Sequence, residues 1–89
     1  MTATEAFIQT IKNDPATLDA VISAETRIQK AVDEGKYKAR LSVAIEEMPC
    51  VTEYLILHGF TVHLPYNSEH KGGARIDHFE VSWANPKTN

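Results

Sequence analysis

Cysteine is almost absent from the chain, with Cys50 as its single example. One cysteine excludes an internal disulfide and argues against a small secreted scaffold that disulfides hold together. The sequence also lacks any apolar run near the roughly 20 residues that a membrane-spanning helix needs. Its first residues contain no basic segment followed by an apolar block, so we expect no signal peptide. We therefore expect a protein made in a reducing cytoplasm, without a membrane partner.

Positive charge is also scarce. The chain has 9 Lys and Arg residues against 12 Asp and Glu, which gives a net charge of -3 at pH 7. Binding to duplex nucleic acid requires a clustered basic surface, so we expect no duplex partner. The 89 residues are 43% apolar and 24% charged, which is ordinary for one small globular domain spanning residues 1–89.

The first third of the chain predicts two helices. Thr2 and Glu5 have the spacing of a capping box, and apolar residues at helical spacing follow, which predicts a helix over residues 3–12. Asp14 suits the N-cap and Pro15 the first position of a second helix over residues 15–34, which Gly35 ends. The apolar stripe of this helix contains Leu18, Val21, Ile22, Ile28 and Val32, with Ala24 and Ala31 on its edges.

The remainder predicts three strands and a third helix. Apolar and polar residues alternate from Tyr37 to Glu46, which is typical of a strand with one buried face. Met48-Pro49 ends that strand, and a helix over residues 49–58 follows. Alternation returns over residues 60–64 and 76–83. Between them, residues 65–74 include Gly72-Gly73 and predict a mobile hairpin loop, and residues 85–89 predict a short tail.

The resulting α+β fold has the order ααβαββ. A right-handed crossover followed by a hairpin places the third strand between the other two and antiparallel to both. The outer strands are then parallel to each other, which gives a three-stranded mixed sheet of order 1-3-2 with the helices on one face. The other face is bare, and both edges are open, so we expect a homo-oligomer. The residues expected under the helices are Tyr37, Leu41, Val43, Ile45, Phe60, Val62, Leu64, Phe79, Val81 and Trp83.

Candidate binding residues lie on the bare face and in the predicted hairpin loop. The four histidines match no zinc-binding spacing, so we expect no metal; His63 and His78 are either solvent-facing or opposed across the strands. Cations beside paired glycines can hold an anion, so the loop is either a small-anion contact or only a mobile tip. The candidate ligand- or partner-binding residues are Lys38, Arg40, His63, Lys71, Arg75, His78 and Glu80.

No constellation of residues predicts catalysis. Cys50 lies near a helix N-terminus, which lowers a thiol pKa, but no histidine lies near it in the sequence. Glu46 and Glu47 are adjacent in the predicted strand, so their side chains point to opposite faces and cannot share a site. We expect a protein that is not an enzyme and has no cofactor.

One pattern of turn and core residues extends over much of the chain. Its residues are Ala31, Gly35 and Tyr37, then Leu55, Gly59, Phe60 and Val62, then Val81, Ser82 and Trp83. This pattern resembles that of a group of small proteins carried by tailed bacteriophages, which has tyrosine and isoleucine where this chain has Phe60 and Val81. The group defines no catalytic residues, so the resemblance supports the fold more than an activity.

The resemblance implies a phage-encoded protein with one of two roles. The first is a virion component of capsid or tail, which assembles with itself and with other phage proteins. The second is a phage accessory protein that antagonises host defence, by binding a host protein or by sequestering a nucleotide signal. The expected location is the virion in the first case and the host cytoplasm in the second.

Overall fold

A computed structural model of the protein describes the backbone of residues 1–84 and the side chains of residues 1–63, 72–73 and 75–84. The predicted α+β order of helices and strands is confirmed, and the predicted tail at residues 85–89 lies outside the described residues. The elements are α1 (Ala3–Lys12), α2 (Pro15–Asp33), β1 (Lys38–Ala44), a 3-10 helix η1 (Ile45–Glu47), α3 (Met48–Leu57), β2 (Thr61–Lys71) and β3 (Ala74–Ser82).

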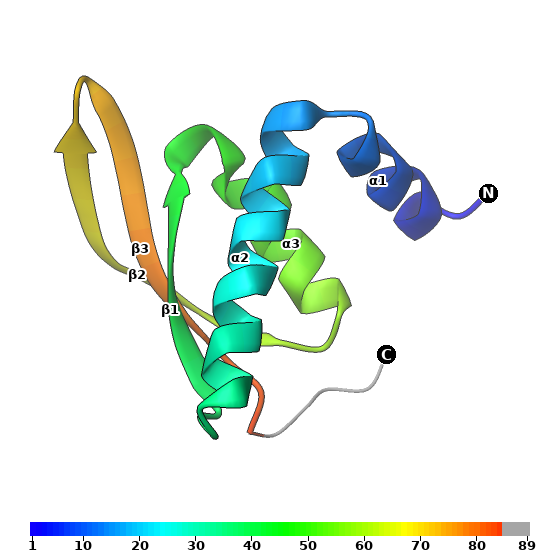
Figure 1. Cartoon of the computed structure of the whole chain (residues 1–89). Helices are drawn as coiled ribbons and strands as arrows, with labels where there is room; N and C mark the ends of the chain where they lie inside the picture. The colour runs from blue at the N-terminus through cyan, green and yellow to red at the C-terminus, as the bar shows by residue number, and fades with distance from the viewer. Residues whose placement is uncertain (85–89) are drawn as a thin grey trace.

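The sheet has the predicted strand order, with β3 hydrogen-bonded between β1 and β2 and antiparallel to both. The two outer strands run in the same direction but do not pair with each other. Both hydrogen-bonded strand pairs are therefore antiparallel. Helices α2 and α3 cover one face of the sheet, while α1 packs against α2 (Figure 1). The opposite face carries no helix.

The core lies between the sheet and the two covering helices. Phe79 and Val81 of β3 are 0% exposed, and Leu41 and Val43 of β1 pack beside them. The predicted alternation is therefore confirmed at the centre of the sheet. It is wrong for Tyr37, which is 68% exposed because it precedes β1, where the helices no longer cover the chain.

Strand β1 also ends earlier than predicted. It stops at Ala44, and η1 then carries Glu46 and Glu47 before α3 begins at Met48. The two glutamates are therefore in a helical turn, not in a strand. Pro49 lies in the first turn of α3, where its missing N–H costs no helical hydrogen bond.

The buried stripe of α2 is rotated relative to the prediction. Val21 and Ile28 are buried as expected, but Ile22 and Val32 are 51% and 46% exposed. Two alanines in the buried row have small side chains, which let the helix lie close to β1 and turn its flank of larger residues outward. The buried residues of α2 are Thr17, Val21, Ala24, Ile28 and Ala31.

The helix ends follow the local signals in the sequence. Gly35 has φ of +76°, and the Lys36 N–H donates to the Ala31 carbonyl over 2.9 Å, which closes α2 as a left-handed cap does. Gly59, with φ of +88°, closes α3 in the same way. At the start of α1, the Thr2 hydroxyl accepts from the Glu5 N–H over 3.1 Å, as the capping-box pattern predicts.

The start of α2 differs from the prediction in one detail. Asp14 occupies the N-cap position, but its carboxylate accepts no backbone hydrogen bond. It accepts instead from the hydroxyl of Thr17 over 2.8 Å, and the same hydroxyl contacts the carboxylate of Glu47 from η1. A hydroxyl has one proton, so it donates to one carboxylate at a time. The contact joins the start of α2 to η1.

The predicted loop at residues 65–74 is wrong. β2 continues to Lys71 and β3 begins at Ala74, so only Gly72-Gly73 form the turn. Both glycines have positive φ, +54° and +84°, as the tightest hairpin turns require. The pairing register shifts between His63 and Asn67 in β2. Pro65 lies in this irregular interval of an edge strand, where proline is tolerated, although proline among polar residues is typical of a loop.

The far end of the hairpin extends beyond β1. The pairing of β1 with β3 stops at Ala44 and Ile76, whereas β2 and β3 remain paired up to Lys71 and Ala74. Residues 69–75 therefore form an arm, which we call the hairpin arm, that passes the end of β1 (Figure 1).

Candidate functional site

The bare face of the sheet gathers most of the residues that the sequence predicted for binding. The register aligns polar residues from all three strands in cross-strand rows, with β3 at the centre. Five predicted candidates, Lys38, Arg40, His63, His78 and Glu80, belong to these rows. The rows are Lys38, Ser82 and Thr61; Arg40, Glu80 and His63; and Ser42, His78 and Asn67.

The two histidines of this face each contact a serine. His63 Nε2 lies 3.1 Å from Ser82 Oγ, and His78 Nδ1 lies 2.8 Å from Ser42 Oγ. His63 is opposite Glu80 in the register, so the alternative of an opposed histidine pair is wrong. These contacts hold the side chains in a hydrogen-bonded polar surface.

Arg75 lies apart from that surface. It is two residues before Asp77, on the side of β3 that carries Phe79, and its Nε lies 3.1 Å from Asp77 Oδ1. Asp77 is only 6% exposed, so this ion pair compensates part of the cost of burying a carboxylate. Within one chain, Arg75 and Arg40 therefore lie on opposite faces of the sheet. The side chain of Lys71 lies outside the described residues.

A groove of about 630 Å³ lies between α2 and β1. Five of its nine lining residues are Lys or Arg, and the whole chain has only nine such residues. We call this hollow the basic groove. Its lining consists of Arg27, Lys30, Ala31, Glu34, Lys36, Lys38, Ala39, Arg40 and Glu80.

Local acidic residues offset little of this positive charge. Lys36 Nζ lies 3.1 Å from Glu34, and Lys38 Nζ lies 4.0 Å from Glu80. All four side chains are at least 36% exposed, and ion pairs at such exposure are weak.

Arg27 and Lys30 form no ion pair with any residue that the structure describes. The Arg27 guanidinium donates only to the backbone carbonyl of Arg40, over 3.5 Å. The groove therefore keeps an excess of positive charge.

Three cations of the groove, Arg27, Lys30 and Lys36, are not among the candidates predicted from the sequence, and two of them, Arg27 and Lys30, belong to α2. They lie on the flank of α2 that borders β1, and only the packing of the helix on the sheet brings them beside Lys38 and Arg40. Their spacing of three residues, which puts them on one flank of a helix, was the available signal.

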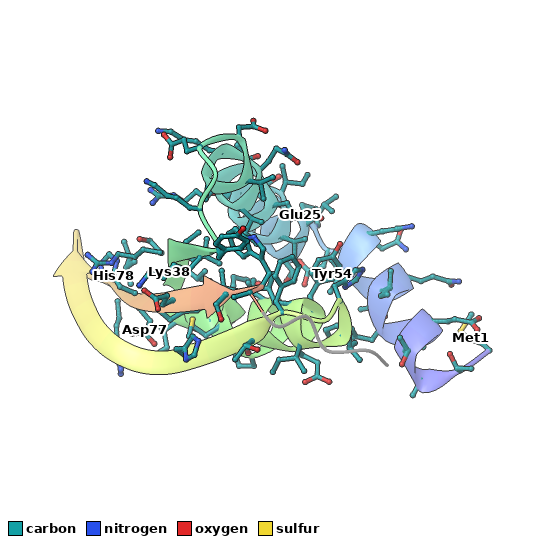
Figure 2. The ribbon with its side chains drawn as sticks, turned by 90° about the horizontal axis from the view of Figure 1, so that it is seen from below. Met1, Glu25, Lys38, Tyr54, Asp77 and His78 are labelled. Carbon is teal, nitrogen blue, oxygen red and sulfur yellow. The ribbon has the colours of Figure 1, made fainter. Side chains whose placement is uncertain are left out.

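A second contact joins α2 to α3. Glu25 of α2 and Tyr54 of α3 are labelled in Figure 2, and Tyr54 Oη lies 3.4 Å from the Glu25 carboxylate. The centroids of the Tyr54 and His58 rings are 4.2 Å apart. Burial raises the pKa of the Tyr54 phenol, and the negative charge of Glu25 raises it further. The adjoining hollow, about 220 Å³, is also lined by Phe60, whose ring packs edge-on against Trp83 at 6.0 Å. This contact connects the two helices.

Potential metal ligands are dispersed among the described residues. Within the part of the chain that the structure describes, no three His, Cys, Asp or Glu side chains are placed to hold a metal ion. Cys50 is a free, partly exposed thiol in the first turn of α3. Among residues 1–84, no helix combines the length and the apolar character needed to cross a membrane.

Comparisons with protein-family models, with curated proteins and with solved structures found no match to this chain. The surfaces described above therefore carry the functional argument.

Proposed function

We propose that this chain is a phage-encoded, non-enzymatic protein that acts by assembly, as a small virion component of the capsid or tail. The observation that carries the proposal is a three-stranded sheet covered by helices on one face only, with β1 and β2 as open edges. The pattern of turn and core residues shared with small phage proteins supports the phage origin.

Features of both edge strands disfavour the pairing of further chains with the sheet. β1 carries the exposed cations Lys38 and Arg40, and β2 is interrupted by the irregular interval that contains Pro65. Charges, proline and bulges are the features that keep edge strands from pairing with further chains. Contact through the bare face, supported by the hairpin arm, instead favours a closed oligomer, the commonest form of homo-oligomer.

Ile76 provides a test of the bare face. It is a large apolar residue of that face at the last pair that joins β1 to β3, where it is opposite Ala44 and Glu69, and it is partly buried. Ile76→Lys should reduce the oligomer to monomers, measured by light scattering during size-exclusion chromatography. Ile22→Lys is the matched control, because Ile22 is 51% exposed on the helical side.

Both variants should keep the circular dichroism spectrum of the parent. An Ile76→Lys protein that assembles as the parent does would show that the bare face is not the contact. Mass spectrometry of purified virions tests the virion role separately, because a virion component copurifies with the particle and an accessory protein does not.

The basic groove favours a second candidate function. Under this proposal the chain is a phage accessory protein in the host cytoplasm that antagonises host defence, by binding a host protein or by sequestering a nucleotide signal. Arg40 then contributes to an anion site, and Arg40→Ala should abolish the protection that the expressed chain gives a phage against a nucleotide-signalling defence. Unchanged protection by Arg40→Ala would count against this candidate.

A further inference from the structure

We propose that the basic groove is a binding site for a compact ligand that carries two or more phosphate groups. This site would give the second candidate function a location and a ligand class, and it does not depend on the assembly proposal. The charge, the size and the lining of the groove carry the argument.

Positive charge is concentrated in the groove, although the chain as a whole carries a net negative charge. Arg27 and Lys30 come from α2, Lys36 from the connection that follows, and Lys38 and Arg40 from β1. The chain as a whole has a net charge of -3, so this gathering is not a consequence of composition. The C-terminal end of a helix favours nearby cations, which accounts for Lys30 but not for the cations of β1.

The size of the groove points to a small ligand. Its volume of about 630 Å³ falls within the range of about 300–1,000 Å³ that small-molecule sites occupy. A long polyanion would extend past the groove onto a chain with 12 acidic residues. The positive surface is therefore matched to a ligand whose charges are closely spaced.

The lining selects phosphate over a nucleobase. None of the described residues that line the groove is aromatic, so they offer no stacking surface for a base. Arg27 and Arg40 provide forked, planar donors that match phosphate oxygens, while the three lysines provide point charges. Ala31 and Ala39 also line the groove, and their short side chains leave room for a ligand beside the cations.

The test is a nuclear magnetic resonance titration of the ¹⁵N-labelled chain at low salt with three probes: ATP, inorganic tripolyphosphate and adenosine. ATP and tripolyphosphate should shift the amide signals of residues 27–40 and saturate with one ligand per chain, whereas adenosine should leave them unchanged. Equal affinities would assign recognition to the phosphate chain alone, and tighter binding of ATP would add a contact to the nucleoside.

Arg27→Gln combined with Lys30→Gln should weaken binding of both phosphate probes by roughly tenfold or more, because charge-assisted contacts are lost. Lys12→Gln is the matched control, since Lys12 is exposed on α1 outside the groove, and it should bind as the parent does. The proposal is overturned if neither phosphate probe saturates at millimolar concentration, if the double variant binds normally, or if adenosine binds equally well. The oligomeric state of the same samples is measured separately, so failure here leaves the assembly proposal standing.

Discussion

Gly35→Ala isolates the energetic contribution of one backbone conformation. Gly35 has φ of +76°, and a Cβ built there meets no atom within 4 Å, so alanine would not clash with any neighbour. The left-handed conformation costs an L-residue about 1–2 kcal/mol. Alanine also lowers the conformational entropy of the unfolded chain, which offsets about 0.4–1 kcal/mol of that cost. The free energy of unfolding should therefore fall by about 1 kcal/mol, and the melting temperature by about 4–8 °C.

Urea denaturation followed by far-ultraviolet circular dichroism measures this change. Gly35→Asn is the informative companion, because asparagine tolerates the left-handed region better than alanine and should lose less stability. A Gly35→Ala protein that is more stable than the parent would refute a left-handed cap at the end of α2. A loss above about 3 kcal/mol would refute the open space around this residue, because the left-handed conformation alone costs only about 1–2 kcal/mol.

Three further variants test the packing. Phe79→Ala should lower the free energy of unfolding by about 3–5 kcal/mol, because the ring is fully buried; a loss under 1 kcal/mol in urea denaturation would contradict its central place. Thr17→Val keeps the volume but removes the hydroxyl contacts to Asp14 and Glu47, and should cost about 1 kcal/mol in the same assay; no loss would mean that these contacts are not made. Tyr54 has a raised pKa in the folded chain, so stability should fall as pH rises above about 10 and the unfolded phenol ionises first. Glu25→Gln should lower the pKa of Tyr54 in an ultraviolet absorbance titration, and an unchanged pKa would contradict the contact.

The helix ends and the strand order were predictable because their causes are local. A capping box, a proline at the start of α2 and glycines at positions 35 and 59 act within one helical turn. The alternation that buries Phe79 and Val81 also lies within a single strand. The right-handed crossover from β1 to β2, followed by the hairpin, then predicts the order β1-β3-β2, which the structure confirms.

The errors concern residues whose placement depends on distant parts of the chain. Ile22 and Val32 are exposed because α2 turns its small residues, Ala24 and Ala31, toward the sheet. Helical periodicity alone does not distinguish a stripe of large residues from a neighbouring stripe of small ones. Likewise, polar residues with a proline between two strands are typical of a loop, and the pairing with β3 overrides that tendency.

The candidate site was predictable in part for the same reason. Residue parity along the strands placed Lys38, Arg40 and Glu80 on one face, as the structure does. Parity also separates Arg75 from them, because Arg75 lies on the face of β3 that carries Phe79. Arg27 joins the groove only through the packing of α2 on β1.

Native mass spectrometry of the purified, unmodified chain tests the central claim of assembly most directly. A bare sheet face with two open edges predicts a closed oligomer with a defined number of subunits. A population of monomers at micromolar concentration would contradict the claim, because the bare face would then be stable in contact with solvent and without a second subunit.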